Sequence, residues 1–456
     1  MTAEAVLRGE LPWAVAQGDA LTVLRTLPDA SVACVVTSPP YWGLRRYKAG
    51  EQEIGSEGTL QEWVAALVGI FRECRRVLRD DGSLWVNVGQ SWGRGSHDGT
   101  GSEKQRSDRG ANEMGHGGES NGNVLGLPWR LAFALQEDGW LLRSEVIWAK
   151  DSPMPESINS WRFEGDTLRR GSWRPTDAHE SLFLLTKAMG QYSDKEAVAE
   201  PTQDNDYGSR HGIHRLAPED GRNDVDMTAY SPTSRNPRSV QRFPTEPTSW
   251  DYCLGCNTWF GHGGHARRLV NRWLETVADE DGGERQVPHA RCPVCKQADQ
   301  FVSHYAAFPT GLPAWCIRAS TPERGVCTAC GMPWARAIEH ENAVLVKSAR
   351  AAALAQEGYK TQTSGEQVEP AHTRTLGWLP TCLCSKPVIG ALILDPFSGT
   401  GSTLVAAVRL GRRAVGIDLH PGYAALSRRR IVTQAPIGNR ADTVTQHGDA
   451  QIGMPL

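Results

Sequence analysis

The motif TSPPYW at residues 37–42 brings together residue types that could activate an amino group. An amino group on a nucleobase shares its lone pair with the ring, so it attacks a methyl group poorly until hydrogen-bond acceptors pull on its protons. The Ser38 hydroxyl and a backbone carbonyl can both accept such bonds. Pro39 and Pro40 lack amide hydrogens and fix φ, which stiffens the turn and leaves carbonyls as its polar face. The motif therefore predicts a site that polarises an amino group.

The position of this motif also favours ligand binding. It follows Val32–Val36, an apolar run that predicts a buried strand. In open α/β sheets ligands bind at the carboxyl ends of strands, and the Tyr41 ring could stack there on a base taken out of the duplex. An ordinary proline turn after a buried strand is the alternative interpretation of the same residues.

A second motif, LILDPFSGTGST at residues 392–403, has the pattern of a cofactor loop. A strand-like run ends in Asp395, the chain turns through Gly399 and Gly401, and a helix-like stretch follows. Glycines let the backbone approach a ligand closely, and the amino end of a helix favours a carboxylate or phosphate. The next strand-like run ends in Asp418, about one βαβ step later, where an acid can bind ribose hydroxyls.

Together the two motifs resemble those of the S-adenosylmethionine-dependent DNA amino-methyltransferases. The S-P-P-Y turn precedes the D-P-F-x-G-x-G loop, as in the permuted β group of that family. The similarity covers residues 12–187 and 304–434. Its further blocks are AQGD (16–19), GSLWVNVG (82–89), EVIWAKDSPMPES (145–157), RPTDAHESLFLLTK (174–187) and HYAAFPTGLPAWCIRAS (304–320).

The resemblance implies roles for individual residues. Ser38, Pro39, Pro40 and Tyr41 are expected to form the catalytic turn that holds the target base. The residues expected to bind S-adenosylmethionine are Asp19, Phe308, Pro309, Asp395, Phe397, Gly399, Gly401 and Asp418. Simpler interpretations remain open, because Asp395 and Asp418 could each cap a helix and Phe308 could be a core residue.

The resemblance also implies direct methyl transfer to an exocyclic amino nitrogen of double-stranded DNA, with the target base flipped out. Methylation of a cytosine ring carbon uses a cysteine in a Pro-Cys dipeptide, and this chain has no Pro-Cys. In the family, serine at the first position of the catalytic motif accompanies cytosine, whereas Asp or Asn accompanies adenine. Ser38 therefore favours N4-methylation of cytosine, and N6-methylation of adenine is the alternative. Glutamine- and RNA-directed relatives place the cofactor loop first, opposite to the order here.

An interpretation from another class is a non-catalytic, zinc-containing DNA-binding protein. It predicts a damaged catalytic or cofactor motif, and both motifs are intact. The remaining sequence shows no recognisable nuclease motif, so a role in restriction and modification would need a separate endonuclease.

The expected fold is α/β: a doubly wound, mostly parallel Rossmann-like methyltransferase sheet with an inserted zinc-binding recognition domain. Apolar periodicity predicts helices at Leu60–Leu78 and Leu125–Leu135, and strands at Ser83–Val88, Trp140–Ala149 and His179–Thr186. The core pattern stops between Gly190 and Ser303, at the place where this family carries its target-recognition domain.

Four parts of the chain are expected. Residues 1–189 form the catalytic part of the core, with a mobile glycine-rich loop at 89–123 that is either a lid ordered by DNA or an inert insertion. The others are a target-recognition insert with a zinc site at 190–303, the cofactor-binding part of the core at 304–326 and 385–456, and a second zinc-clipped insertion at 327–384.

Eight of the eleven cysteines occur in close pairs. A C-x-x-C pair presents two thiolates from one tight turn, as tetrahedral zinc requires, and disulfides are less expected in a cytosolic protein. One expected site is Cys253, Cys256, Cys292 and Cys295, with His262, His265 and His289 as weaker alternative ligands. The other is Cys327, Cys330, Cys382 and Cys384, although C-x-C is a less usual spacing. A purely structural role for these modules is the alternative to DNA recognition.

Composition adds little to these expectations. The 456 residues contain no apolar stretch long enough for a membrane span and no signal-peptide pattern, so a soluble, cytoplasmic protein is expected. The formal net charge is −3, so any surface that contacts DNA phosphates must be local. The candidates are Arg45, Arg46, Lys48, Arg235, Arg238 and Arg242, although an arginine in such a position is more often solvated surface than a phosphate contact.

Overall fold

The structure is a computed structural model. It describes residues 2–43, 53–93, 122–153, 162–169, 173–201, 234–244, 250–253, 256, 258–261, 271–278, 284–297, 301–303, 308–341, 344–347, 366–369 and 372–435. Most of the predicted mobile loop and the candidates Arg45, Arg46 and Lys48 lie outside these residues. The chain divides into two compact units. Unit 1 comprises Met1–Tyr192, Ser239–Ser320 and Gly390–Leu456, and unit 2 comprises Ser193–Arg238 and Thr321–Ile389.

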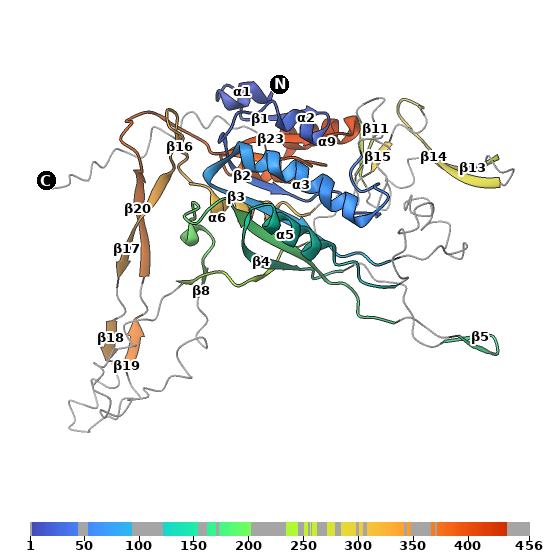
Figure 1. The fold of residues 1–456 in the computed structure, drawn as a ribbon, viewed down its shortest axis with the longest axis horizontal. Coiled ribbons are helices and arrows are strands. Elements are labelled where there is room, and N and C mark those ends of the chain that lie inside the picture. The colour runs from blue at the N-terminus through green and yellow to red at the C-terminus, as the bar shows by residue number, and fades with distance from the viewer. Residues whose placement is uncertain are drawn as a thin grey trace. The chain divides into compact units, whose positions relative to one another are not determined.

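An eight-stranded sheet forms the centre of unit 1, in the order β1-β23-β22-β2-β3-β7-β4-β10. Figure 1 labels β1, β23, β2, β3 and β4 of this sheet. The strands are β1 (Trp13–Gln17), β2 (Val32–Thr37), β3 (Leu78–Val88), β4 (Leu141–Ala149), β7 (His179–Thr186), β10 (Val240–Arg242), β22 (Leu392–Asp395) and β23 (Arg413–Asp418). All neighbours pair in parallel except β7, which is antiparallel to both β3 and β4. The predicted mostly parallel α/β sheet is thus confirmed.

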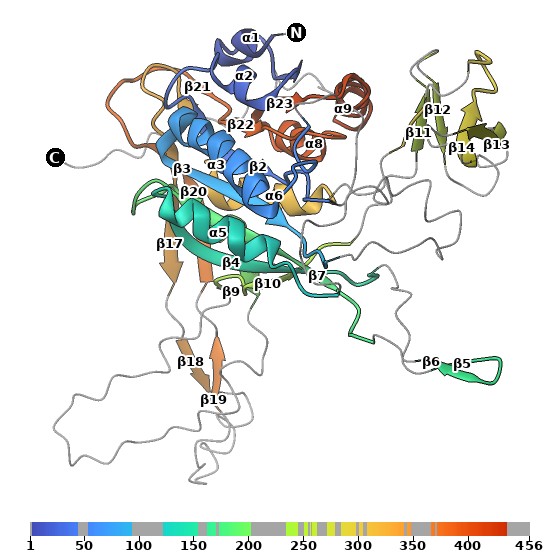
Figure 2. The ribbon, with the colours of Figure 1, turned by 45° about the vertical axis from the view of Figure 1, so that its right-hand side comes forward.

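Helices cover both faces of this sheet (Figure 2). One face packs under α3 (Leu60–Val77) and α5 (Leu127–Glu137), and the other under α6 (Gly311–Ser320), α8 (Ser402–Arg409) and α9 (Pro421–Gln434). The short helices α1 (Ala3–Leu7) and α2 (Ala20–Leu24) add to the first layer. Because β2 is covered on both faces, all six of its residues are buried, which explains its continuous apolar sequence.

The predicted helix at residues 60–78 shows why the local sequence folds as it does. Thr59 and Glu62 form a capping box that satisfies backbone amides at the start of α3. Its buried side chains recur at helical spacing; they include Trp63, Leu67, Ile70, Phe71, Cys74 and Val77.

The expectation that the core pattern stops at Gly190 was wrong in one respect. Strand β10, only three residues long, pairs with β4 as the edge of the main sheet, and the following Phe243 is buried against the helix layer. A strand this short has no periodicity that sequence inspection could detect.

The rest of this region in unit 1 forms separate small sheets from β11 (Trp250–Cys253), β12 (Thr258–Gly261), β15 (Phe301–Ser303), β13 (Asn271–Ala278) and β14 (Glu284–Arg291). A further hairpin of unit 1 pairs β5 (Arg162–Glu164) with β6 (Thr167–Arg169).

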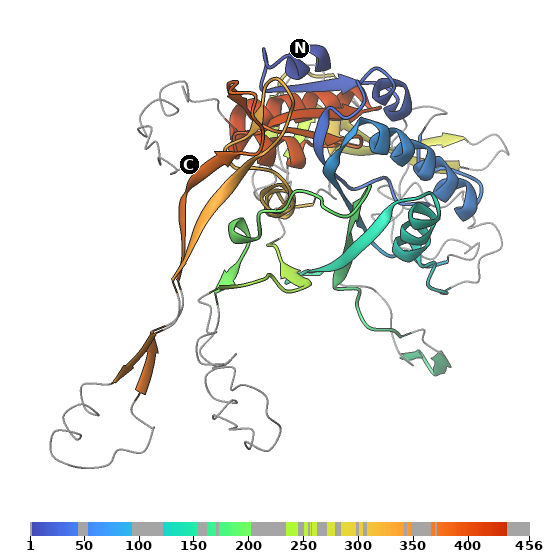
Figure 3. The same ribbon diagram turned by 60° about the vertical axis from the view of Figure 1, so that its left-hand side comes forward.

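Unit 2 consists mainly of two-stranded ribbons (Figure 3). Strand β16 (Val326–Cys327) pairs with β21 (Val388–Ile389), β17 (Trp334–Glu341) with β20 (His372–Pro380), and β18 (Val344–Lys347) with β19 (Glu366–Glu369). A short 3-10 turn at Lys195–Ala197 precedes β8 (Glu200–Pro201), which pairs with β9 (Ser234–Arg235). Arg336 of β17 donates to both Asp194 and Glu323, which ties three segments of the unit together.

Gly401 is the N-cap of α8 and packs against Ser427 of α9. Its φ is +81°, and a Cβ at this position would lie 2.3 Å from Ser427 Oγ and 3.1 Å from Ser427 Cβ. Alanine is therefore disfavoured both by the left-handed backbone and by the neighbouring helix.

Replacing Gly401 with alanine should destabilise unit 1. Gly139→Ala is the matched control, because Gly139 also has positive φ (+95°) but would place its Cβ in open space. We expect about 1–2 kcal/mol of lost stability from the left-handed backbone in both variants, and a further loss of about 1–3 kcal/mol only in Gly401→Ala. Urea unfolding measures both. Equal losses would show that α8 and α9 are not in close contact.

Candidate active site

Most of the residues predicted to bind base and cofactor lie at one edge of the main sheet. The catalytic turn follows β2, Phe397 and Gly399 follow β22, Asp418 ends β23, and Asp19 comes two residues after β1. These four strands are mutually parallel neighbours, so their carboxyl ends lie along the same edge. Such an edge is where open α/β sheets bind ligands.

A buried hydrogen bond joins the two sequence motifs directly. Thr37 Oγ1 donates to Asp395 Oδ1 at 2.6 Å, although the residues are 358 positions apart in the chain. Phe397 donates its backbone N–H to the same oxygen at 3.1 Å. Burial raises the pKa of the Asp395 carboxyl to about 6, and hydrogen bonds from Thr37 and Thr403 limit that increase. The catalytic turn and the cofactor loop are thus fixed to each other at their first residues.

The catalytic turn is held by side chains from other elements. The Trp63 indole donates to the Pro40 carbonyl at 2.9 Å, which fixes the turn onto α3. Ser38 Oγ lies 3.2 Å from the Tyr41 hydroxyl. Gly89 allows the close packing of the ring, because a Cβ there would lie 3.0 Å from Tyr41 Cε2 and 3.3 Å from the Glu180 carboxyl carbon.

A hydrogen-bond network that begins at the Tyr41 hydroxyl contains three residues that sequence analysis missed, Glu180, Asn87 and Lys150. Tyr41 donates to Glu180 Oε2 at 2.9 Å, and Asn87 Nδ2 donates to the same oxygen at 2.6 Å and to the Tyr41 hydroxyl at 3.3 Å. Lys150 Nζ donates to Glu180 Oε1 at 2.5 Å. The sequence does contain one signal for Glu180, which is a glutamate near the start of an otherwise apolar strand, HESLFLLT. Burial, with the Glu180 charge nearby, raises the pKa of the Tyr41 phenol well above its usual value, so the phenol stays protonated.

The cofactor loop folds back on the end of β23. Asp418 accepts from the backbone N–H of Gly399 at 2.8 Å and from that of His420 at 2.9 Å. Burial raises the pKa of the Asp418 carboxyl to about 7, and these two amide donors oppose the increase. Each carboxylate oxygen has a second lone-pair position, so Asp418 can still accept from ribose hydroxyls. Gly399 and Gly401, both with positive φ, leave the loop without side chains at its turns.

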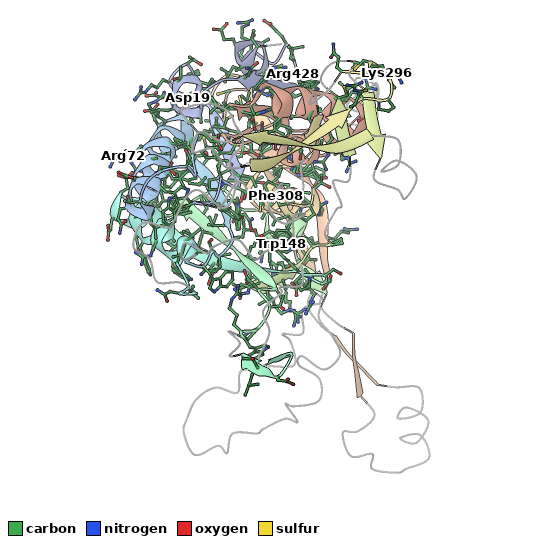
Figure 4. All side chains as sticks on the ribbon, turned by 90° about the vertical axis from the view of Figure 1, so that its right-hand side faces the viewer. Asp19, Arg72, Trp148, Lys296, Phe308 and Arg428 are labelled. Atoms are coloured by element: carbon green, nitrogen blue, oxygen red, sulfur yellow. The ribbon has the colours of Figure 1, made fainter. Side chains whose placement is uncertain are left out.

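Asp19, Phe308 and Pro309 occupy different settings (Figure 4 labels the first two). Asp19 is the N-cap of α2, and its Oδ1 accepts from the backbone and hydroxyl of Thr22. Phe308 is half-buried against the α6 and α8 layer, which fits both a core residue and a cofactor contact, and Pro309 is buried. Asp19 therefore caps a helix, which is the role considered above as an alternative for Asp395 and Asp418.

The arginines proposed for phosphate contact in the central region already have acidic partners. Arg242 pairs with Asp151 at 2.6 Å in unit 1, and Arg235 and Arg238 both pair with Glu200 in unit 2. These pairs weigh against a phosphate-binding surface formed by the three residues.

The eight paired cysteines form two clusters of four. In each cluster all sulfur atoms lie within 4.8 Å of one another. The first contains Cys253, Cys256, Cys292 and Cys295, with Sγ to Sγ distances of 3.7 Å (Cys253 to Cys295) and 3.5 Å (Cys256 to Cys292). These distances are far longer than a disulfide bond and close to the edge of a tetrahedron with about 2.3 Å metal–sulfur bonds.

The second cluster, Cys327, Cys330, Cys382 and Cys384, lies in unit 2, where β16 pairs with β21. Backbone N–H groups of Cys330 and Ala329 lower the pKa of the Cys327 thiol to about 7, which favours a thiolate ligand. The alternative ligands His262 and His265 lie outside the described residues, and of His289 only the backbone is described. Both clusters could therefore hold a metal with cysteine ligands alone. The remaining thiols, Cys34, Cys74 and Cys316, are buried.

Comparison with known proteins identifies the family. A DNA methylase family model for N6 and N4 methyltransferases matches residues 32–328 and 382–429. The type II methyltransferase M.Cfr9I of Citrobacter freundii is 44% identical over 199 residues, which are 43% of this chain and 62% of that protein. M.XycI of Xanthomonas campestris pv. cyanopsidis is 41% identical over 210 residues, 46% of this chain and 64% of that protein. The chain therefore spans a little under two thirds of the length of these relatives.

Among solved structures, the cytosine-N4-specific PvuII DNA methyltransferase aligns with a TM-score of 0.45 and 15% identity, over 92% of this chain and 86% of that one. Within the described residues, no helix combines the length and apolar character needed to cross a bilayer. Because the family model covers more than half of the sequence and includes both motifs, this chain belongs to the DNA methylase family of N6 and N4 methyltransferases.

Proposed function

We propose that this protein is an S-adenosylmethionine-dependent, site-specific DNA methyltransferase that methylates the exocyclic N4 amino group of cytosine in double-stranded DNA. The observation that carries the proposal is the Thr37 to Asp395 hydrogen bond, which holds the catalytic turn beside the cofactor loop. Transfer needs the amino nitrogen and the methyl donor in near contact, and correct alignment supplies much of the acceleration. Family membership supports the reaction class, and a non-catalytic protein would have no need of this juxtaposition.

The residues of the turn would divide the work of activating the amine. Ser38 Oγ and the Pro39 carbonyl would accept the two amino hydrogens and return the lone pair to nitrogen. The Pro40 carbonyl points to Trp63 of α3 and accepts from its indole, and we assign the Pro39 carbonyl to the base. The Tyr41 ring, fixed through its hydroxyl, would stack on the flipped base.

The cofactor loop fits S-adenosylmethionine, whose sulfonium would supply an electrophilic methyl group. Gly399 and Gly401 let the backbone approach the ligand, Asp418 would bind the ribose, and Asp19 would lie near the adenine through its Oδ2 oxygen. Phe308, Pro309, Phe397 and Asp395 complete the proposed site. Asp395 would act mainly by shaping the loop, since its carboxylate is buried and accepts from Thr37.

Cytosine is the proposed base because Ser38 stands at the first position of the catalytic motif. Adenine N6 is the second candidate, since a hydroxyl can polarise either amine. We further propose that the insert at residues 190–303, apart from the core strand β10, reads the DNA sequence and that each cysteine cluster holds a structural zinc ion. The type II relatives suggest a separate restriction endonuclease as a partner, and a cytoplasmic location accords with this role.

Loss of the Ser38 hydroxyl should slow methyl transfer without weakening cofactor binding. We expect Ser38→Ala to lower the single-turnover rate on duplex DNA by about 10²-fold or more, the scale seen when one polarising group is removed from an active site. Ser31→Ala is the matched control, because Ser31 precedes β2 at its opposite end and its hydroxyl donates to the Pro28 carbonyl, away from the site. An unchanged rate in Ser38→Ala would remove this residue from the mechanism.

The modified base identifies the reaction. Genomic DNA from a host that expresses the protein should contain N4-methylcytosine when digested to nucleosides and analysed by mass spectrometry, and should contain less of it in a host that expresses Ser38→Ala. Dominant N6-methyladenine would transfer the proposal to adenine. Absence of any methylated base, with purified protein also inactive on plasmid DNA, would overturn it.

The purified protein should contain about two zinc ions per chain, one for each cluster. Cys256→Ser and Cys330→Ser should each lose about one zinc ion, whereas Cys74→Ala, which removes a thiol outside both clusters, should keep two. Elemental analysis gives the count. Full zinc content in both serine variants would contradict the assignment.

A further inference from the structure

The Tyr41 hydroxyl lies between Ser38 and Glu180, and the chemistry of its partners sets the direction of each bond. A carboxylate only accepts hydrogen bonds, so in the 2.9 Å contact the Tyr41 proton points to Glu180 Oε2. Asn87 Nδ2 also donates toward Tyr41 and Glu180, so it offers no competing acceptor. The single phenolic proton is therefore committed to Glu180.

The direction of the Tyr41 bond also fixes the orientation of the Ser38 hydroxyl. Because the Tyr41 proton is committed, the 3.2 Å contact between the two hydroxyls requires Ser38 to donate to Tyr41. The chain of bonds then runs from Ser38 to Tyr41 to Glu180. Both lone pairs of Ser38 Oγ face away from this chain and remain able to accept from an incoming amine.

We propose that Glu180 is the terminal proton acceptor of a relay through Ser38 and Tyr41 that removes the proton released when the amino group is methylated. This inference rests on the proposed function. The amino nitrogen gains one methyl group and must lose one proton. Ser38 Oγ takes that proton and passes its own to the Tyr41 oxygen, Tyr41 passes its own to Glu180 Oε2, and both hydroxyls end with one proton each.

The surroundings of Glu180 suit a site where a proton arrives and then leaves. Lys150 holds the carboxylate from the other side, through Oε1. The Glu180 and Lys150 side chains are 14% and 22% exposed, so the pair reaches water and can release the proton after each turnover. Tyr41 stays protonated in this setting and so can pass a proton on without holding a charge. Glu180 is thus a positioning and relay residue that acts through Tyr41.

The variant Glu180→Gln separates the uptake of a proton from the hydrogen bonds that hold Tyr41 in place. Its amide oxygen can still accept from Tyr41 and Asn87, but it cannot take up a proton. We expect Glu180→Gln and Tyr41→Phe to lower the single-turnover methylation rate by about 10²-fold or more, the range of general acid–base catalysis. The double variant should be no slower than the slower single variant, because both changes interrupt one relay. Glu180→Asp should recover part of the rate.

Two further readouts distinguish a relay from a structural role. Dissociation constants for S-adenosylmethionine and for duplex DNA should stay within about twofold of the wild-type values, so the loss falls on the chemical step. The slowed variants should show a larger solvent deuterium isotope effect than wild type, since proton removal becomes rate-limiting. Glu145→Gln is the matched control at wild-type rate, because Glu145 accepts from Ser181 Oγ and takes no part in the relay.

Each outcome bears on a separate claim. Wild-type rate in Glu180→Gln, or in Tyr41→Phe, would overturn the relay while leaving the methyltransferase proposal in place. A loss in Lys150→Met as large as in Glu180→Gln would assign the effect to the ion pair and overturn it as well. If Glu180→Gln failed to fold, Tyr41→Phe would test the same relay from its other end. A wild-type protein that methylates no DNA would overturn the proposed function itself.

Discussion

The hydrogen bond from Thr37 to the buried Asp395 carboxylate is the constraint on which the rest of the site depends. Burying this carboxyl is costly: its pKa of about 6, against 3.8 in water, makes the folded state less stable at neutral pH by on the order of 3 kcal/mol. The folded state binds the Asp395 proton more tightly than the unfolded state does. Protonation of Asp395 therefore favours folding at low pH, and this stabilisation is lost as the pH rises from about 4 to 6. The carboxylate in turn accepts from Thr37 and from Phe397, and so fixes two loops to each other at the edge of the sheet.

The direction of β7 explains how Glu180 reaches that edge. Strands β2, β22, β23 and β1 bring their carboxyl ends to the site, but β7 runs antiparallel to β3 and so brings its amino end. Glu180, the second residue of β7, therefore lies beside the end of β3, within reach of Asn87 and of the turn after β2. In a fully parallel sheet, a residue early in that strand would lie at the opposite edge.

Sequence analysis identified what depends on local pattern. The strand before TSPPYW, the glycine loop, the acid that ends β23 and the paired cysteines each have a signal within a few residues, and the structure brings the predicted members together. It missed what depends on strand direction and pairing, namely Glu180, Asn87 and Lys150, and it missed β10, which is too short to show a period. It also assigned Asp19 to the cofactor without anticipating that one of its oxygens caps α2. The spacing of residues along the chain does not reveal hydrogen bonds between strands that are distant in sequence.

The order of the two motifs along the chain has little effect on their geometry. What places them side by side is the parallel pairing of β2 with β22, and Cys34 aligns with Ile393 regardless of which strand comes first. The long excursion between α6 and β22 is tolerated for a related reason. In unit 2, β16 and β21 pair where that excursion begins and ends, and the second cysteine cluster joins the same two points. When the two ends of a loop are joined at its base, the loop-closure entropy is lost there. The length of the loop then has little effect on the free energy of forming the sheet. A metal at this cluster would therefore stabilise the connection that delivers Asp395 to Thr37.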